Sequence, residues 1–321
     1  MTVPRREIVD EKVVGVYHCI SRCVRRAYLC GYDTVQGRSF DHRKEWVRDR
    51  LRFLVQVFAV DLLAYALMSN HLHTLLRNRP DLASKWSREE VARRWRTLFP
   101  RRRVEGRAAE PSTEEIAAIA NSPKLVRRYR KRLSSLSWLQ RCLSEHIARR
   151  ANREDECTGR FWEGRFKAQR VHEVSGVIAC MAYIDLNPVR AEVATTPHES
   201  DFTSVQDRLR AQSMGRTHSS TPRLSSVEES TQGRLTTTEY LEIVQETARA
   251  ISQKERSKVG PTVRQLLTRV KIRDDTWINT TTNLRPNFKR AVGPVTALSQ
   301  LAQKAGKRWL HGISAARAAF N

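Results

Sequence analysis

Two histidines separated by a single residue, His71 and His73, stand in the segment YALMSNHLHTLLR. If this segment is a β-strand, both imidazoles project from one face, because strand side chains alternate with a period of two. Leu72 then faces the opposite side, toward a core. Two neutral imidazoles at that separation can hold one divalent ion. The pair therefore predicts a metal site on the face of a sheet.

A phenol and an amide further along the chain could act together with such an ion. Tyr183 and Asn187 lie four residues apart in YIDLNPVRAEV, so a helical turn places them on one face. A phenol is a weak nucleophile, and a metal ion helps it by neutralising charge that develops on a phosphate. We expect Tyr183 to attack a phosphodiester, and His71, His73 and Asn187 to hold Mg²⁺ or Mn²⁺.

Other residues compete for these roles. Tyr17 and Tyr65 also carry phenols, but both lie in apolar strand segments and neither has an amide four residues later. His18 falls on the first predicted strand and could point toward the same site. We interpret it as a structural residue, since a lone histidine in an apolar segment is more often a core residue than a ligand.

The alternation and spacing of apolar residues predict the elements that position the histidines. A strand is expected over residues 12–22, and a helix over 41–58 with Asp41 as its N-cap. Two further strands are expected over 60–67 and 71–77, joined by a short turn. This order of strand, helix, strand and strand places His71 and His73 on the last strand.

Helical patterns follow in the second half of the chain. The segment 137–151 has one apolar stripe and predicts an amphipathic helix. The segment 175–186 predicts the helix that carries Tyr183. Pro188 disfavours helical geometry at the residue before it, so this helix should end near Asn187.

The chain divides into parts of different composition. We expect a catalytic domain over residues 1–210, with a helical insertion at about 81–136 in which Ser87 and Ser112 begin capping boxes. Residues 211–238 are rich in Ser, Thr and Arg and predict a linker. Residues 239–321 have helical patterns and predict a C-terminal extension of unknown role.

The charge of the chain predicts a polyanionic partner. Its formal net charge is +24, and so large an excess of cations attracts nucleic acid. Residues 124–132 carry six bases in nine positions, and residues 158–171 interleave bases with aromatic rings that could stack nucleobases. The alternative interpretation is that residues 124–132 form a solvated helix face, and that the aromatic rings of residues 158–171 lie in the core with the charged side chains around them. We expect DNA contacts from Arg22, Lys124, Arg127, Arg128, Arg130, Lys131, Arg132, Arg160, Arg165, Lys167 and Arg170.

Composition also excludes several classes of protein. No stretch of about 18 apolar residues could span a bilayer, and the first residues lack the apolar core of a signal peptide. We therefore expect a soluble, cytoplasmic protein without a membrane partner. The six cysteines form no CxxC pair, which argues against a zinc knuckle and predicts buried free thiols.

Four segments together resemble the single-tyrosine HUH transposases, and most closely their REP-associated tyrosine transposase branch. These are YHCISR, LMSNHLH, GRFWEGRFKAQRV and YIDLNPVRA, and the resemblance covers about residues 12–210. It implies an α+β fold with a ferredoxin-like or RRM-like antiparallel sheet flanked by helices. The family's two histidines fall on His71 and His73, its nucleophile on Tyr183 and its third polar ligand on Asn187.

The resemblance also implies an activity. It implies cleavage of single-stranded DNA through a 5′-phosphotyrosine intermediate with a free 3′-OH. We also expect the protein to recognise a DNA hairpin. We accordingly expect a transposase that is an endonuclease and strand transferase. Two alternatives stay open: a catalytically inactive sequence- or hairpin-specific DNA-binding protein, and an RNA-binding module. Related folds act as monomers or exchange active-site helices, so a homodimer is possible.

Overall fold

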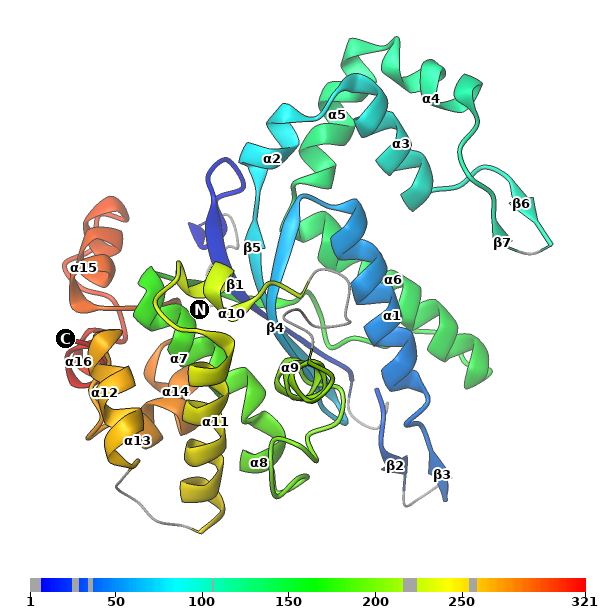
Figure 1. The fold of residues 1–321 in the computed structure, drawn as a ribbon. Coiled ribbons are helices and arrows are strands. Elements are labelled where there is room, and N and C mark those ends of the chain that lie inside the picture. Colours follow the sequence, from blue (N-terminus) through cyan, green and yellow to red (C-terminus); the bar gives the residue numbers. More distant parts are fainter. Residues whose placement is uncertain (1–6, 25–28, 34–36, 106, 216–223, 254–258) are drawn as a thin grey trace.

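A five-stranded sheet is the centre of the fold (Figure 1). The computed structural model describes residues 7–24, 29–33, 37–105, 107–215, 224–253 and 259–321. Within these, the strand order is β4-β5-β1-β8-β9, and all neighbouring pairs are antiparallel except β8 and β9. The bounds are β1 (Gly15–Arg22), β4 (Val60–Leu67), β5 (His71–Asn78), β8 (Lys167–Val171) and β9 (Ala291–Val292).

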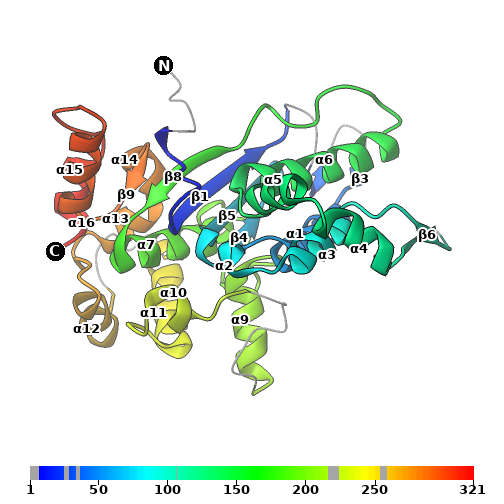
Figure 2. The same ribbon diagram turned by 90° about the horizontal axis from the view of Figure 1, so that it is seen from above.

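Helices cover both faces of this sheet (Figures 1 and 2). Helices α1 (Arg43–Val57) and α6 (Leu136–Glu154) pack against each other on one face, and α7 (Glu173–Asp185) packs on β4, β5 and β8 from the other. Strands β1, β4, β5 and β8 with α1 and α6 between them give the ferredoxin-like order of a split βαβ unit. The predicted α+β class with an antiparallel, helix-flanked sheet is confirmed.

The alternation of side chains on β5 explains why the strand forms here. Leu72 and Leu76 are buried in the core that α1 and α6 share, whereas Leu75 is buried in the core around α7. A shift of register by one residue would exchange these two sets and place both histidines on the wrong face. The burial of leucines on both sides therefore fixes the direction in which His71 and His73 point.

One predicted helix cap is wrong. Helix α1 begins at Arg43 with His42 at its N-cap position, and no side chain caps it there. The carboxylate of Asp41 instead accepts the backbone N–H of Gly31 at 3.1 Å and lies 2.8 Å from the Lys44 ammonium. Asp41 is therefore used to hold the preceding loop, which contains β2 (Tyr32–Asp33) and β3 (Arg38–Ser39).

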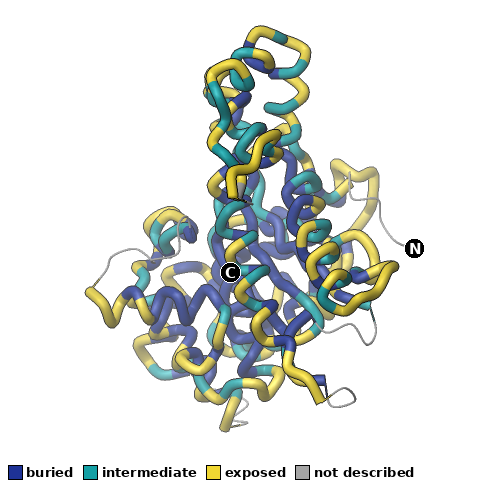
Figure 3. The backbone as a smooth tube through the Cα atoms, turned by 90° about the vertical axis from the view of Figure 1, so that its right-hand side faces the viewer, coloured by how far each residue is buried: buried dark blue, intermediate teal, exposed yellow. Residues whose placement is uncertain are grey.

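The predicted insertion forms an arm that projects from the sheet, with many exposed and half-buried residues (Figure 3, top). Ser112 and Glu115 form a reciprocal capping box, as predicted. Ser87 caps its helix, but the Glu90 carboxylate binds Arg94 in place of the backbone. The arm contains α2 (Pro80–Lys85), α3 (Arg88–Leu98), β6 (Arg103–Val104), β7 (Arg107–Ala108), α4 (Thr113–Ala120) and α5 (Pro123–Leu133).

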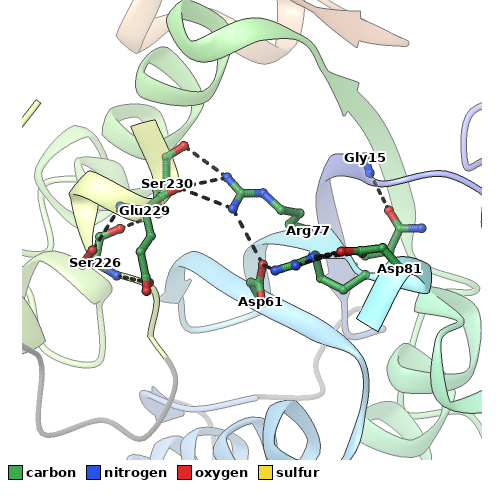
Figure 4. A network of polar contacts seen from close by, with 9 residues as sticks. Gly15, Asp61, Arg77, Asp81, Ser226, Glu229 and Ser230 are labelled. Atoms are coloured by element: carbon green, nitrogen blue, oxygen red, sulfur yellow. Dashed lines mark hydrogen bonds and ion pairs between the residues drawn. The ribbon is translucent and has the colours of Figure 1, made fainter. Parts of the chain in front are cut away.

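A polar network attaches the segment that begins at residue 224 to the sheet (Figure 4). Arg77 on β5 donates to the carbonyl oxygens of Glu229 and Ser230 and lies 3.7 Å from the Asp61 carboxylate on β4. Leu224 also bridges to Leu62 of β4. Part of the predicted linker thus contacts the sheet, and residues 216–223 lie outside the described residues. The segment contains α10 (Val227–Thr231).

The predicted C-terminal extension is helical and shares a hydrophobic core with α7. Its largest buried side chain, Trp277, donates from Nε1 to the Thr247 hydroxyl at 2.7 Å. Strand β9 of this segment adds an edge to the sheet. The remaining helices are α8 (Asn187–Arg190), α9 (Ser204–Ser213), α11 (Thr237–Ser252), α12 (Pro261–Arg269), α13 (Trp277–Thr282), α14 (Leu284–Asn287), α15 (Val295–Lys304) and α16 (Ile313–Ala319).

The structure bears on two predictions from composition, one about the cysteines and one about helices that could cross a membrane. All six cysteines are free thiols, and every one except Cys157 is buried. In the part of the chain that the structure describes, no helix combines the length and the apolar character that crossing a bilayer requires.

Candidate active site

Three histidines and a glutamine gather on the sheet face that α7 covers. His71 and His73 come from β5, His18 from β1 and Gln169 from β8. His18 pairs in register with Gln169 across β1 and β8, and Ile20, two residues later, pairs with His73 across β1 and β5. His18 and His73 are thus diagonal neighbours on adjacent strands, within reach of each other.

Helix α7 brings the predicted phenol against this cluster within the same chain. The Tyr183 ring lies edge-on to the rings of His73 and His18, with centroids 5.8 Å apart in both cases. The His71 and His73 rings are 4.8 Å apart. Tyr183 is only 6% exposed, so the packing of α7 on the sheet fixes its place beside the histidines.

The electrostatics of the site keep the imidazoles neutral. Burial lowers the pKa of His71 to about 4, with a smaller contribution from the positive charge of Arg22. Burial, and then the neighbouring His18, lower the pKa of His73 well below its ordinary value. Neutral imidazoles are the form that binds metal ions.

In each of the two predicted histidine ligands, Nδ1 forms a hydrogen bond and Nε2, within the part of the chain that the structure describes, does not. His73 Nδ1 lies 2.7 Å from His18 Nε2, and His71 Nδ1 lies 2.7 Å from Asn70 Oδ1. Among the described residues, neither Nε2 atom forms a hydrogen bond. A metal-binding histidine commonly uses its second nitrogen in this way, and the bond orients the ring. His71 and His73 therefore fit a divalent ion.

Asn187 lies at the start of α8, just after the helix that carries Tyr183, and is 5% exposed. Its Nδ2 is buried and has no hydrogen-bond partner in the part of the chain that the structure describes. A buried amide without a partner is costly and often marks a missing ion or water. Rotation of this amide by half a turn presents Oδ1 at the same place, so Asn187 fits an oxygen ligand. Among the described residues, no group of three or more His, Cys, Asp or Glu side chains is arranged to hold a metal ion, so a third ligand beside His71 and His73 has to be of another kind.

Arg190 and Arg285 are two residues that sequence reasoning missed. The Arg190 guanidinium carbon lies 4.0 Å from the centre of the Tyr183 ring, and its Nη1 donates to the Thr282 carbonyl at 2.7 Å. The charges of both arginines lower the pKa of His71 and His73. Arg190 follows Tyr183 by seven residues, two helical turns, and that spacing could have revealed it. No sequence signal connects Arg285, which comes from α14, to this site.

The bases predicted to contact DNA differ in exposure. On α5, Arg130 is half-buried and donates to the Trp86 carbonyl at 2.7 Å, and Arg132 stacks on Trp138 at 4.3 Å. Phe161 is buried in the core, so it cannot stack a base, and Arg170 lies over the ring of Tyr17. The side chains exposed to solvent are Arg22, Lys124, Arg127, Arg128, Lys131, Arg160, Arg165 and Lys167.

A buried carboxylate two residues after the phenol fixes the end of α7. Asp185 accepts hydrogen bonds from the Ser204 hydroxyl, the Val205 N–H and the Tyr240 hydroxyl, and lies 3.6 Å from the buried Arg208 guanidinium. Burial raises the pKa of the Asp185 carboxyl, an effect that Arg208 opposes. Asp185 thus joins α7 to α9 and to α11 in the C-terminal segment.

We predict that Asp185→Ala destabilises the protein by about 3–5 kcal/mol, because it leaves the Arg208 charge buried without a counterion. The measurement is urea denaturation followed by circular dichroism. Asp275→Ala is the matched control. Asp275 forms an exposed ion pair with Arg273 at 2.7 Å, so this substitution should change the stability little. Equal effects of the two variants contradict the prediction. If Asp185→Ala does not fold, Tyr240→Phe tests the same network with an expected cost of about 1 kcal/mol.

Comparison with known proteins gives a similarity to a solved structure. No family model matches the chain, and no curated protein matches it. Among solved structures, one of a REP-associated tyrosine transposase bound to a REP hairpin aligns with 66% of this chain and 87% of its own. The sequences are 12% identical over this alignment, with a TM-score of 0.37.

Proposed function

We propose that the protein is a metal-dependent endonuclease and strand transferase for single-stranded DNA, a transposase that uses Tyr183 as its nucleophile. One observation carries the proposal: a buried phenol lies with its ring 5.8 Å from that of a neutral histidine, which itself neighbours a second one. The two segments that bear these groups are more than a hundred residues apart in sequence. Their meeting on one face of the sheet supports a shared chemical role.

The proposed reaction is a transesterification. The Tyr183 oxygen attacks the scissile phosphorus, an O–P bond to the phenol forms, and the P–O3′ bond breaks. The phenolic proton ends on the departing oxygen, which becomes a free 3′-OH. One phosphodiester replaces another, so the step needs no ATP. The reverse reaction, with a new 3′-OH as the attacking group, joins strands.

The residues around Tyr183 have separate parts in this reaction. His71, His73 and Asn187 would hold Mg²⁺ or Mn²⁺, which neutralises charge on the phosphate when it is bound. The Arg190 guanidinium lies over the phenol ring and attracts its π face, which holds the ring in position beside the histidines. Tyr183 and His73 are almost fully buried, which limits the access of water that would otherwise compete with the 3′-OH.

The experiment that tests the function is detection of a covalent adduct. Single-stranded oligonucleotides with and without hairpins, labelled at either end, are incubated with the protein and Mg²⁺ or Mn²⁺, then separated under denaturing conditions. The proposal expects the 3′-labelled fragment to migrate with the protein and the 5′-labelled fragment to be released. The proposal is wrong if no oligonucleotide in a broad set gives an adduct with either ion.

We propose in addition that the exposed bases of α5 bind the DNA backbone. Replacing Lys124, Arg127, Arg128 and Lys131 by alanine should weaken hairpin binding roughly 10- to 100-fold and lower the slope of log K against log salt by about 3–4. Fluorescence anisotropy over a salt series measures both.

The control for the α5 variant removes four exposed cations from the C-terminal segment, Arg249, Arg264, Lys271 and Arg317. It changes net charge equally, so it should leave the affinity within about threefold of the unsubstituted protein. Equal losses of affinity in the two variants would mean that these cations act only through the net charge of the protein, and that α5 does not contact the DNA directly.

A further inference from the structure

A line of hydrogen bonds runs from the C-terminal segment to the candidate metal ligand. The carbonyl oxygen of Phe288, just after α14, accepts a hydrogen bond from Gln169 Nε2. Gln169 Oε1 lies 2.9 Å from His18 Nδ1, and His18 Nε2 lies 2.7 Å from His73 Nδ1. All of these side chains are buried. The line therefore crosses β8, β1 and β5 and ends at His73.

The chemistry of these groups gives the line one direction. A backbone carbonyl can only accept, so the Gln169 atom that faces Phe288 has to be the amide nitrogen, and the other is the accepting Oε1. His18 Nδ1 must then donate to Gln169. A neutral imidazole has one N–H, so His18 Nε2 is an acceptor, and His73 Nδ1 must carry the proton that it accepts.

From this geometry we propose that His18 and Gln169 are positioning residues, which hold His73 in the tautomer with its proton on Nδ1. The lone pair of His73 is then on Nε2, the nitrogen to which no described residue forms a hydrogen bond. The relevance to catalysis rests on the proposed function, in which His73 holds the ion. His18, which we interpret from the sequence as a structural residue, has this specific role in addition.

The same arrangement assigns a role to the C-terminal segment. Phe288 supplies the fixed acceptor at the start of the line, and Thr282 supplies the carbonyl that holds Arg190 over Tyr183. Two backbone carbonyls of a segment outside the first 210 residues thus orient a candidate ligand and the cation beside the candidate nucleophile. The segment acts as a support for the active site.

The direct test is the tautomer of His73 in the metal-free protein, observed by ¹⁵N NMR of protein labelled at histidine. The His73 signals are assigned by their loss in His73→Gln. We expect a protonated Nδ1 and an unprotonated Nε2 at pH 7.5, whereas histidine in water favours the reverse. A proton on Nε2 of His73 in the unsubstituted protein overturns the proposal.

Substitutions of Gln169 test the cause of this tautomer. Gln169→Met removes the acceptor for His18, so His73 should lose its single tautomer and the Mn²⁺ affinity, measured by electron paramagnetic resonance, should fall about 10- to 100-fold. Gln169→Glu in its neutral acid form keeps both an acceptor for His18 Nδ1 and a donor to the Phe288 carbonyl, so it should preserve both quantities. The ionised carboxylate would instead charge His18 and reverse the line, so the comparison is made over a range of pH. Rescue by glutamate separates orientation of His73 from simple support of the fold.

Gln140→Met is the matched control for these variants. Gln140 is a buried glutamine whose Nε2 lies 3.3 Å from the Thr74 hydroxyl, on the opposite face of the same sheet. This variant should leave the His73 tautomer and Mn²⁺ affinity unchanged. A change equal to that in Gln169→Met contradicts the proposal. If the His73 tautomer changes in these variants as expected but no DNA adduct is ever detected, the positioning role of His18 and Gln169 is supported and the proposed cleavage is not.

Discussion

Replacing Tyr183 by phenylalanine is expected to lower covalent attachment to single-stranded DNA by about 10⁴-fold or more, because it removes the only atom proposed to bond to phosphorus. The substitution keeps the ring, and with it the packing against His18 and His73 and the stacking of Arg190. Stability and hairpin affinity should therefore change little. The adduct assay and fluorescence anisotropy measure the two quantities separately.

The rival phenols are poorly placed to replace Tyr183. The Tyr65 hydroxyl donates to the Asp207 carboxylate at 2.6 Å, and burial raises the pKa of Tyr65 well above its ordinary value. The Tyr17 hydroxyl donates to the Asp10 carbonyl at 3.2 Å, and burial raises the pKa of this phenol also. A phenol that is buried and already donating a hydrogen bond is a poor nucleophile.

Tyr129→Phe is the control for the nucleophile. Tyr129 lies on α5 in the arm and stacks on Trp95 with ring centroids 4.0 Å apart. Removing its hydroxyl changes the same chemical group in a different place and should leave adduct formation intact. Persistence of the adduct in Tyr183→Phe would falsify the assignment of the nucleophile.

Replacing His73 by alanine should abolish detectable Mn²⁺ binding and lower cleavage about 10²- to 10³-fold. Two contributions add here. The variant loses a proposed ligand, and it leaves His18 Nε2 buried without the N–H that it accepts. Isothermal titration with Mn²⁺ and the adduct assay at saturating DNA measure binding and cleavage.

His71→Ala and His311→Ala complete this series. His71 is the second proposed ligand and should show the same loss of Mn²⁺ binding with a smaller loss of stability, because its Nδ1 partner, Asn70, is half-buried and can bind water instead. His311 is exposed near the C-terminus, far from the site in sequence, and its substitution should change neither quantity. Unchanged Mn²⁺ binding in both His71→Ala and His73→Ala contradicts the proposed site.

Several features followed from local sequence patterns alone. The two strands over residues 60–67 and 71–77 are present as β4 and β5. Both are buried at nearly every position, because helices cover both faces of the sheet and each face needs side chains that can be buried. The helix over 175–186 is present as α7 and ends at Asp185. Pro188 follows the end of α7 and lies in the first turn of α8, and its effect acts within one turn of helix, so the sequence reveals it.

The partners across the sheet did not follow from these patterns. His18 lies opposite Gln169 only because β1 and β8 pair in one particular register. Local alternation indicates which face a side chain takes, but it carries no information about which strand lies beside it. The predicted cap at Asp41 is wrong for a related reason. The position of Asp41 before a helical pattern does not reveal that its carboxylate accepts the backbone N–H of Gly31, ten residues earlier.

The sequence by itself determined that His71 and His73 share a face and that Tyr183 lies on a helix, because both facts depend on spacings of a few residues. Only the tertiary structure decided that this helix packs over that face, and that Phe288 and Thr282 support the site from the C-terminal segment. Such contacts depend on the burial of apolar surface between segments distant in sequence. Many pairs of helices and strands could bury their apolar surfaces against each other. Which pairs form depends on the packing of all the segments together, and a local sequence pattern does not contain that information.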